Sequence, residues 1–148
     1  MLKNIPPLLT PDALHALASM GHGDEVAIVD ANFPAAGVAR LGGARHVELA
    51  GANATEVLQA VLHVLPLDHF ESDAAWTMQV VGDALAIPEP VAEFAAALRQ
   101  AGEPPAATLE RFDFYRRAQS AFVILRSGES RKYGNILLRK GVIASDGE

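Results

Sequence analysis

Apolar and polar residues recur along this chain in two spacings, one typical of helices and the other typical of strands. Apolar positions three or four residues apart predict helices, and short apolar or alternating runs predict strands. The helical spacing occurs at residues 11–20, 54–65, 90–101 and 113–120. Strand patterns occur at residues 25–30, 45–49, 76–82, 108–112, 121–126 and 135–140. Helices and strands are therefore expected to follow one another along the chain.

Residues that favour helix starts and loops support these boundaries. Thr10 can cap the first helix through its hydroxyl, and Asn53 with Glu56 forms a capping-box pattern at the second. A proline and three glycines lie within residues 31–43, so we expect that segment to be a loop.

The order of these elements predicts an α/β fold. The length of 148 residues suits one domain, residues 1–148, and we find no internal repeat or linker. Alternating strands and helices favour a three-layer α/β/α sandwich, in which helices cover both faces of a mostly parallel or mixed sheet.

Composition and charge exclude several classes of function. The net charge of −6 argues against nucleic-acid partners, which need a basic surface, and a neutral small molecule suits this chain better. The chain has no cysteine, so it has no disulfides and no thiol nucleophile. The N-terminal segment lacks the apolar run of a signal peptide, and no run approaches the length of a membrane span. We therefore expect a cytoplasmic protein with no membrane partner.

The best local candidate for chemistry is His22, within Gly21-His22-Gly23-Asp24. The flanking glycines would let the backbone approach a ligand while one imidazole is presented to it. The alternative is a tight turn whose histidine is merely exposed.

Asp30 follows a short apolar strand, and in α/β folds the carboxyl ends of strands face the ligand crevice. Its carboxylate could accept hydrogen bonds from sugar hydroxyls, or it could simply cap the next turn. Arg111 offers a planar fork of donors that can fix two hydroxyl oxygens, although it also fits a solvated amphipathic junction. Tyr133, Gly134 and Asn135 supply a phenol and an amide around a glycine, which suits a neutral polyol but is also a common turn.

Other chemistries fit the sequence less well. His22, Asp24 and Asp30 could bind a metal ion, but no HExxH or paired-histidine spacing is present, so we expect no metal site. There is no Gly-x-Ser-x-Gly elbow of a hydrolase and no phosphate-binding loop.

Taken together, the motifs resemble the L-fucose mutarotase and D-ribose pyranase family, and its fucose mutarotase branch in particular. The resemblance runs from Met1 to about Val142. It rests on the order and spacing of Met1-Leu2-Lys3, Ile5-Pro6-Pro7-Leu8-Leu9, Gly21 to Glu25, Asp30, Phe33-Pro34, Arg111-Phe112, Phe114-Tyr115, Ala118-Gln119, Gly128-Glu129 and Lys132 to Leu138.

The resemblance implies roles for individual residues. His22 would be the proton donor, and Asp30 and the segment Tyr133, Gly134, Asn135 would bind substrate. The ribose branch usually has histidine in place of Arg111 and alanine in place of Gly134, so the fucose branch matches better. Tyr115 matches an aromatic substrate-binding position of the fucose branch. Asn32 departs from the family, because some fucose-type members have a histidine there.

The resemblance also implies an isomerase without a cofactor, assembled as a ring-shaped homo-oligomer such as a decamer. The predicted function is interconversion of the α and β anomers of L-fucose or a related aldose, with a monosaccharide as partner. An imidazole can give and take a proton at neutral pH, which suits the ring opening that this reaction needs. Two alternatives are a D-ribose pyranase and a non-catalytic sugar-binding module. The group that removes the anomeric proton is unassigned among water, Tyr133 and His22.

Overall fold

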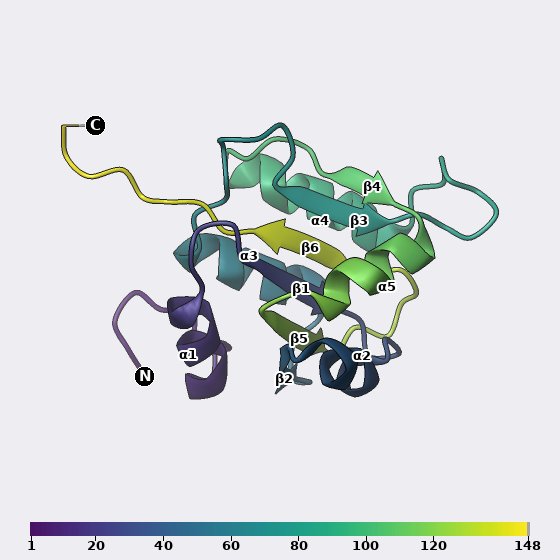
Figure 1. Cartoon of the computed structure of the whole chain (residues 1–148), viewed down its shortest axis with the longest axis horizontal. Helices are drawn as coiled ribbons and strands as arrows, with labels where there is room; N and C mark the ends of the chain where they lie inside the picture. The colour runs from purple at the N-terminus through teal and green to yellow at the C-terminus, as the bar shows by residue number, and fades with distance from the viewer. Residues whose placement is uncertain (148) are drawn as a thin grey trace.

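A computed structural model describes residues 1–147, which form one mixed six-stranded sheet between two layers of helices (Figure 1). The predicted three-layer α/β/α sandwich is confirmed. The helices are α1 (Pro11–Ser19), α2 (Ala35–Gly42), α3 (Ala54–Val64), α4 (Glu89–Gln100) and α5 (Arg111–Gln119). The strands are β1 (Glu25–Val29), β2 (Arg45–Leu49), β3 (Ala75–Met78), β4 (Ala107–Leu109), β5 (Val123–Ser127) and β6 (Ile136–Arg139).

Strand order explains where a ligand crevice can form. The order across the sheet is β2-β5-β1-β6-β3-β4, and all neighbouring pairs are parallel except those that involve β6. The carboxyl ends of β1, β3, β4 and β5 therefore lie at one edge, together with the start of the antiparallel strand β6. This edge is where α/β folds bind ligands.

The two helical layers form separate cores on the two faces of the sheet. Helices α1, α3 and α4 pack against one face, and α2 and α5 pack against the other (Figure 1). Residues Val26 to Val29 of β1 are fully buried because both faces of this central strand are covered, which explains its unbroken apolar sequence. The capping box predicted at Asn53 and Glu56 is also present.

The loop predicted for residues 31–43 is wrong, because α2 lies within it. Its buried residues Ala35, Val38 and Ala39 follow helical spacing, and Gly43 ends the helix in the left-handed conformation with φ 79°. Gly42 is one of the glycines that favour a loop in the sequence, but it is needed for close packing: a Cβ there would lie 1.7 Å from the carbonyl oxygen of Gln119. Glycine here marks contact between α2 and α5 rather than a break.

Two predicted strands are too long. The strand predicted at residues 76–82 ends at Met78, and the strand predicted at residues 108–112 ends at Leu109. Helix α5 begins at Arg111 because the carboxylate of Glu110 accepts hydrogen bonds from the backbone N–H groups of Phe112 and Asp113. Arg111 and Phe112 therefore lie on a helix. Among the described residues, no helix is long and apolar enough to cross a membrane.

Candidate functional site

A pocket of about 350 Å³ opens at the carboxyl edge of the parallel strands. This volume is within the range of sites for small organic ligands. Its walls come from the ends of β1 and β3, the start of α5 and the loop before β6. It is lined by Asp30, Asn32, Phe33, Met78, Arg111, Tyr115, Lys132, Tyr133 and Asn135. Five of the seven predicted site residues therefore meet in one pocket.

Asp30 follows β1 directly and is almost completely buried. Its carboxylate accepts a hydrogen bond of 3.0 Å from the backbone N–H of Asn32, and its own N–H donates to Oδ1 of Asn135 at 2.9 Å. Burial raises the pKa of the Asp30 carboxyl above its ordinary value, although hydrogen bonds from Asn32, Phe33 and Gly134 act in the opposite direction. The site thus holds a desolvated carboxylate that can gain from a ligand's hydroxyl donors.

Arg111 and Tyr115 lie one helical turn apart on α5 and face the same pocket. Nε of Arg111 donates to the hydroxyl oxygen of Tyr115 at 3.2 Å, and the guanidinium carbon lies 5.4 Å from the centre of that ring. The Tyr115 ring packs edge-on against Phe33 at 5.2 Å. The hydrogen bond to Tyr115 raises the pKa of Arg111, so this cation persists at every physiological pH. Together they form a wall that is apolar at its base and carries donors at its tip.

The segment before β6 has a backbone that few sequences tolerate. Tyr133 has a φ of 62°, in the left-handed region, and its hydroxyl accepts a hydrogen bond of 3.1 Å from the N–H of Val81. Gly134 packs against Glu129, because a Cβ at residue 134 would lie 2.7 Å from Cγ of Glu129. Gly134 does not line the pocket but sets the path that aims Tyr133 and Asn135 into it.

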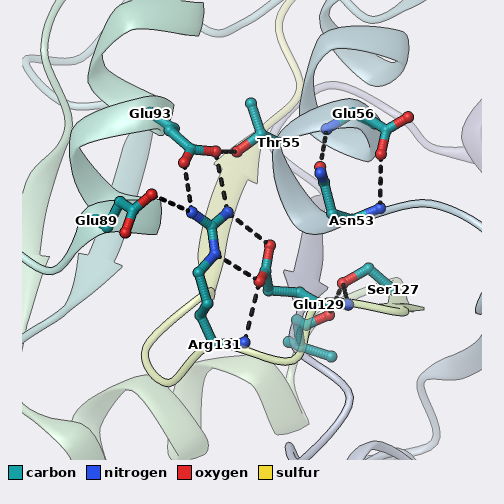
Figure 2. Close-up of polar contacts among 9 residues, drawn as sticks. Asn53, Thr55, Glu56, Glu89, Glu93, Ser127, Glu129 and Arg131 are labelled. Atoms are coloured by element: carbon teal, nitrogen blue, oxygen red, sulfur yellow. Dashed lines mark hydrogen bonds and ion pairs between the residues drawn. The ribbon is translucent and has the colours of Figure 1, made fainter.

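A cluster of charged side chains connects this segment to helices α3 and α4 (Figure 2). Arg131 donates to both carboxylate oxygens of the buried Glu129, at 2.8 and 3.0 Å. Its other contacts reach Glu93 at 2.5 and 3.0 Å and Glu89 at 3.0 Å, both in the first turns of α4. Glu93 accepts a further hydrogen bond from the Thr55 hydroxyl on α3.

These contacts also change the ionisation of the cluster. Hydrogen bonds from Arg131 and Thr55 lower the pKa of Glu93 to about 2, and the carboxylates in turn raise the pKa of Arg131. The pKa of Glu129 is also lowered, mainly by its hydrogen bond from Arg131. The backbone carbonyl of Glu129 accepts from the N–H of Ala31, next to Asp30. The cluster therefore connects two helices to two of the three chain segments that carry polar groups of the pocket.

His22 is not part of the pocket. It lies in the turn between α1 and β1, at the amino end of β1, whereas Asp30 lies at the carboxyl end (Figure 1). The five residues of β1 alone span roughly 16 Å at about 3.3 Å per residue. His22 instead contacts Asp68, with 3.3 Å between Nε2 and Oδ1, and the ring of Phe70 at 5.2 Å. Within a single chain, the predicted proton carrier therefore lies far from the predicted sugar-binding residues.

The sequence did not reveal every residue of the pocket. Met78 and Phe33 line it, and the cluster of Arg131 with Glu129 supports it, but none of these was predicted as a site residue. Met78 ends β3, so the rule that ligands bind at carboxyl ends of strands could have found it. Arg131 gave no clear signal, because two of its three carboxylate partners, Glu89 and Glu93, come from a distant helix. Among residues 1–147, no group of three or more histidine, aspartate or glutamate side chains is placed to hold a metal ion.

The chemistry of the pocket suits a neutral polyol. Asp30 is an acceptor, Arg111 and Lys132 are donors, and Tyr133 and Asn135 can do both. Apolar surface from Phe33, Met78 and Tyr115 can pack against the C–H groups on one face of a sugar ring. The residues that line the pocket include no imidazole and no thiol.

Comparisons with known proteins agree with this picture. A family model described as "RbsD / FucU transport protein family" matches residues 3–143. Fucose mutarotase from Homo sapiens is 43% identical over 147 residues, and the alignment covers 97% of this chain and 95% of that protein. A crystal structure of the fucose mutarotase from Streptococcus pneumoniae in complex with L-fucose is 36% identical with a TM-score of 0.88, and covers 97% of this chain and 100% of that one. The structure of Bacillus subtilis RbsD complexed with D-ribose is 20% identical with a TM-score of 0.74 and covers 97% of this chain and 100% of that chain, so it is similar in fold.

Proposed function

The chain belongs to the RbsD/FucU family, as the sequence motifs predicted, and we propose that it is a sugar mutarotase that interconverts the α and β anomers of L-fucose or a related aldose. The observation that carries this proposal is the pocket at the carboxyl edge of the sheet, where a buried carboxylate, a guanidinium, a phenol and an amide meet beside aromatic walls. The identity of 43% to a fucose mutarotase supports fucose over ribose as the substrate type.

The reaction is a proton exchange at a cyclic hemiacetal. The ring oxygen takes a proton while the anomeric hydroxyl loses one, so that the ring bond breaks and an aldehyde forms. Rotation about the bond to the aldehyde carbon then lets the ring close on the other face, with the reverse proton movements. No electrons are gained or lost, so a redox cofactor has no part in this chemistry.

Each group of the pocket has a task in this reaction. Asp30 accepts hydrogen bonds from sugar hydroxyls, and Arg111 donates to hydroxyl oxygens with two N–H groups at once. Tyr133 and Asn135 bind the remaining hydroxyls, and Tyr115 supports Arg111. Fixing the sugar in this way presents its ring oxygen to a proton carrier in one orientation, which lowers the entropic part of the barrier.

His22 is the proton carrier in this proposal, and it comes from a second copy of the chain. Because β1 separates His22 from its own pocket, an imidazole can reach the sugar only when the amino end of β1 in one subunit docks beside the pocket of another. This arrangement requires a homo-oligomer, and a closed ring such as a decamer satisfies it for every subunit. We expect this oligomer to act in the cytoplasm.

Saturation-transfer NMR on the anomeric protons of L-fucose tests the proposed activity. Exchange between the two anomers should exceed the spontaneous rate and should fall to that rate in His22→Ala. Fucose that binds without faster exchange would contradict the enzyme and favour a sugar-binding module. The same measurement with D-ribose and D-galactose tests substrate preference, and ring exchange of ribose alone would favour a ribose pyranase.

Mixed oligomers test whether two subunits share one site. His22→Ala removes the proton carrier and Asp30→Asn raises KM, so each variant alone should show little activity at a low fucose concentration. When the two variants are unfolded, mixed and reassembled, about one quarter of the sites should combine an intact His22 with an intact Asp30 from another chain. Each variant reassembled alone is the control. No recovery in the mixture would contradict the shared site while leaving the mutarotase activity itself untouched.

A further inference from the structure

The segment between β3 and α4 reaches the pocket through a short turn. The chain extends away from the body of the molecule after Met78 and returns to it at Glu89 (Figure 1). Its first residue is fixed to β4, because the N–H of Gln79 donates to the carbonyl of Leu109 at 2.8 Å and its side-chain amide donates to the hydroxyl of Thr108 at 3.0 Å. The turn that follows therefore starts from a defined position.

Residues 80–83 form this turn. The N–H of Asp83 donates to the carbonyl of Val80 at 3.1 Å, and Gly82 has a φ of 80°. Among residues 1–147, the residues with a side chain and a positive φ lie outside this turn, so Val81 has a negative φ. This is the pattern of a type II turn. The turn is closed by the N–H of Asp83, which leaves the N–H of Val81 for a partner elsewhere.

That partner is the hydroxyl of Tyr133. The N–H of Val81 donates to this oxygen at 3.1 Å, although the two residues are 52 positions apart in the sequence. The side chain of Val81 is exposed, so its backbone makes the contact. The other side of Tyr133 packs against the apolar cluster that contains Phe33 and Met78. The core and the turn together therefore fix where the hydroxyl lies.

A phenol that accepts this hydrogen bond can still donate its own hydrogen. The hydroxyl carries one hydrogen, and the acceptor side of its oxygen faces the N–H of Val81. Linked hydrogen bonds polarise one another, so the N–H on the oxygen makes the hydroxyl a stronger donor. The charge of Arg111 acts on the same phenol, because Tyr133 is among the groups that raise the pKa of Arg111, after the hydrogen bond to Tyr115. The hydrogen of Tyr133 can then point into the pocket that Tyr133 lines.

We infer that Val81 is a positioning residue for Tyr133: its backbone N–H holds the phenol as a hydrogen-bond donor, so that Tyr133 binds an acceptor oxygen of the sugar. This inference rests on the proposed function and gives one direction to a contact that a phenol could make in either direction. A hydroxyl that donates its hydrogen to the sugar is not the group that takes the anomeric proton.

The hydrogen bond can be tested without any sugar. Val81 lies in an exposed turn, so the hydroxyl of Tyr133 is what protects its N–H from exchange with water. Exchange of the Val81 amide in heavy water, followed by NMR, should be several-fold faster in Tyr133→Phe than in the wild type. The amide of Asp83, which is bonded within the turn, is the internal control and should change little. Equal exchange of the Val81 amide in both proteins would overturn the inference.

Val81→Pro removes this N–H and keeps the turn, because proline is common at the second position of a type II turn. KM for L-fucose should rise about two- to tenfold, the usual effect of losing one hydrogen bond between neutral groups. The kcat should stay within about a factor of two, because this contact holds the sugar both before and during ring opening. The same substitution in Tyr133→Phe should have no further effect on KM. An unchanged KM in Val81→Pro, or an equal rise in both backgrounds, would refute the role of Val81.

Ala84→Pro is the matched control. Ala84 is exposed and holds the same place in the next turn, where the N–H of Ala86 donates to the carbonyl of Asp83 at 3.1 Å. The substitution adds a proline to the same segment and leaves the N–H of Val81 in place, so KM and kcat should both stay at the wild-type values. A rise in KM as large as that of Val81→Pro would assign the effect to the stiffness of the segment and overturn the inference.

The direction of the contact is tested by Tyr133→3-fluorotyrosine. Fluorine beside the hydroxyl makes a phenol a stronger donor and a weaker acceptor. At a pH where this phenol is neutral, the dissociation constant of L-fucose measured by calorimetry should fall, by up to about tenfold. An unchanged or higher dissociation constant would contradict the donor role. Calorimetry needs no turnover, so it decides this point even if anomer exchange is no faster than the spontaneous rate, a result that would refute the mutarotase alone.

Discussion

Replacing Arg131 by alanine should destabilise the protein strongly, because it leaves the carboxylate of Glu129 buried without its main partner. Glu129 has only 2% of its side chain exposed, and Arg131 is the cation that hydrogen-bonds to it. After the substitution, Glu129 retains mainly its hydrogen bond from the backbone N–H of residue 131. The segment that carries Tyr133 and Gly134 then loses the side chain that connects it to α4.

The size of the effect follows from how buried each partner is. Removing one member of a fully buried ion pair costs about 3–5 kcal/mol, whereas an exposed pair contributes about 0–1 kcal/mol. Arg131 is about one-third exposed, so its bonds to Glu129 fall between these limits and those to Glu89 and Glu93 lie near the lower one. We expect a loss of about 2–3 kcal/mol in the free energy of unfolding. For a domain of this size the midpoint of thermal unfolding should fall by about 5–10 °C.

Urea and thermal unfolding of Arg131→Ala, Glu129→Gln and the double variant measure this coupling. The double variant should be more stable than Arg131→Ala, because it no longer buries an unpaired charge. Arg116→Ala is the control, since Arg116 forms an exposed pair with Asp113 and its removal should change stability by no more than about 0.5 kcal/mol. Equal effects of Arg131→Ala and Arg116→Ala, or fully additive effects of the first two substitutions, would refute the reasoning.

Two further predictions concern the pocket. Burial raises the pKa of Asp30, and its ionised form accepts more and stronger hydrogen bonds from hydroxyls than its protonated form does, so KM for fucose should rise as the pH falls through a value above the ordinary 3.8. Asp30→Asn should have a high KM at every pH without this step, and a pH-independent KM in the wild type would contradict the assignment. Gly134→Ala should raise KM and lower stability by about 1–3 kcal/mol, because the new Cβ meets Glu129. Gly37→Ala, on an open face of α2, is its control and should be neutral or slightly stabilising in the same unfolding and activity assays.

The sequence predicted the fold well where each element carries its own signals. β1 is a short apolar run, and α3 begins with a complete capping box, so both were found. α2 was missed because its glycine at position 42 serves a contact with α5, and no local pattern distinguishes such a glycine from a loop residue. β3 is shorter than predicted because the chain turns after it, at the isolated bridge between Val80 and Asp83.

Candidate site residues could be proposed from the sequence where they follow a strand or lie in a recognisable motif. Asp30 could be placed at a ligand-binding edge from its position after β1, and the pocket around it fits that prediction. The contacts of Arg131 with Glu89 and Glu93, and those of Asp68 with His22 and Arg139, could not be predicted, because each joins segments at least 38 residues apart in the sequence. Such pairs depend on how the helices and the end of β6 pack, and periodicity along the chain does not contain that information.

The short strand β6 joins the two separated halves of the proposed site. It follows directly after Asn135, which hydrogen-bonds to the backbone of Asp30, and it ends at Arg139, which holds Asp68. Its residues Ile136, Leu137 and Leu138 are fully buried and carry no polar side chain. A buried strand between two covered faces cannot slide without moving its whole apolar set, so the positions of both ends are fixed together. In the proposed mechanism, the fold thus prepares a sugar-binding half and a proton-carrying half in every subunit, and contact between subunits combines them.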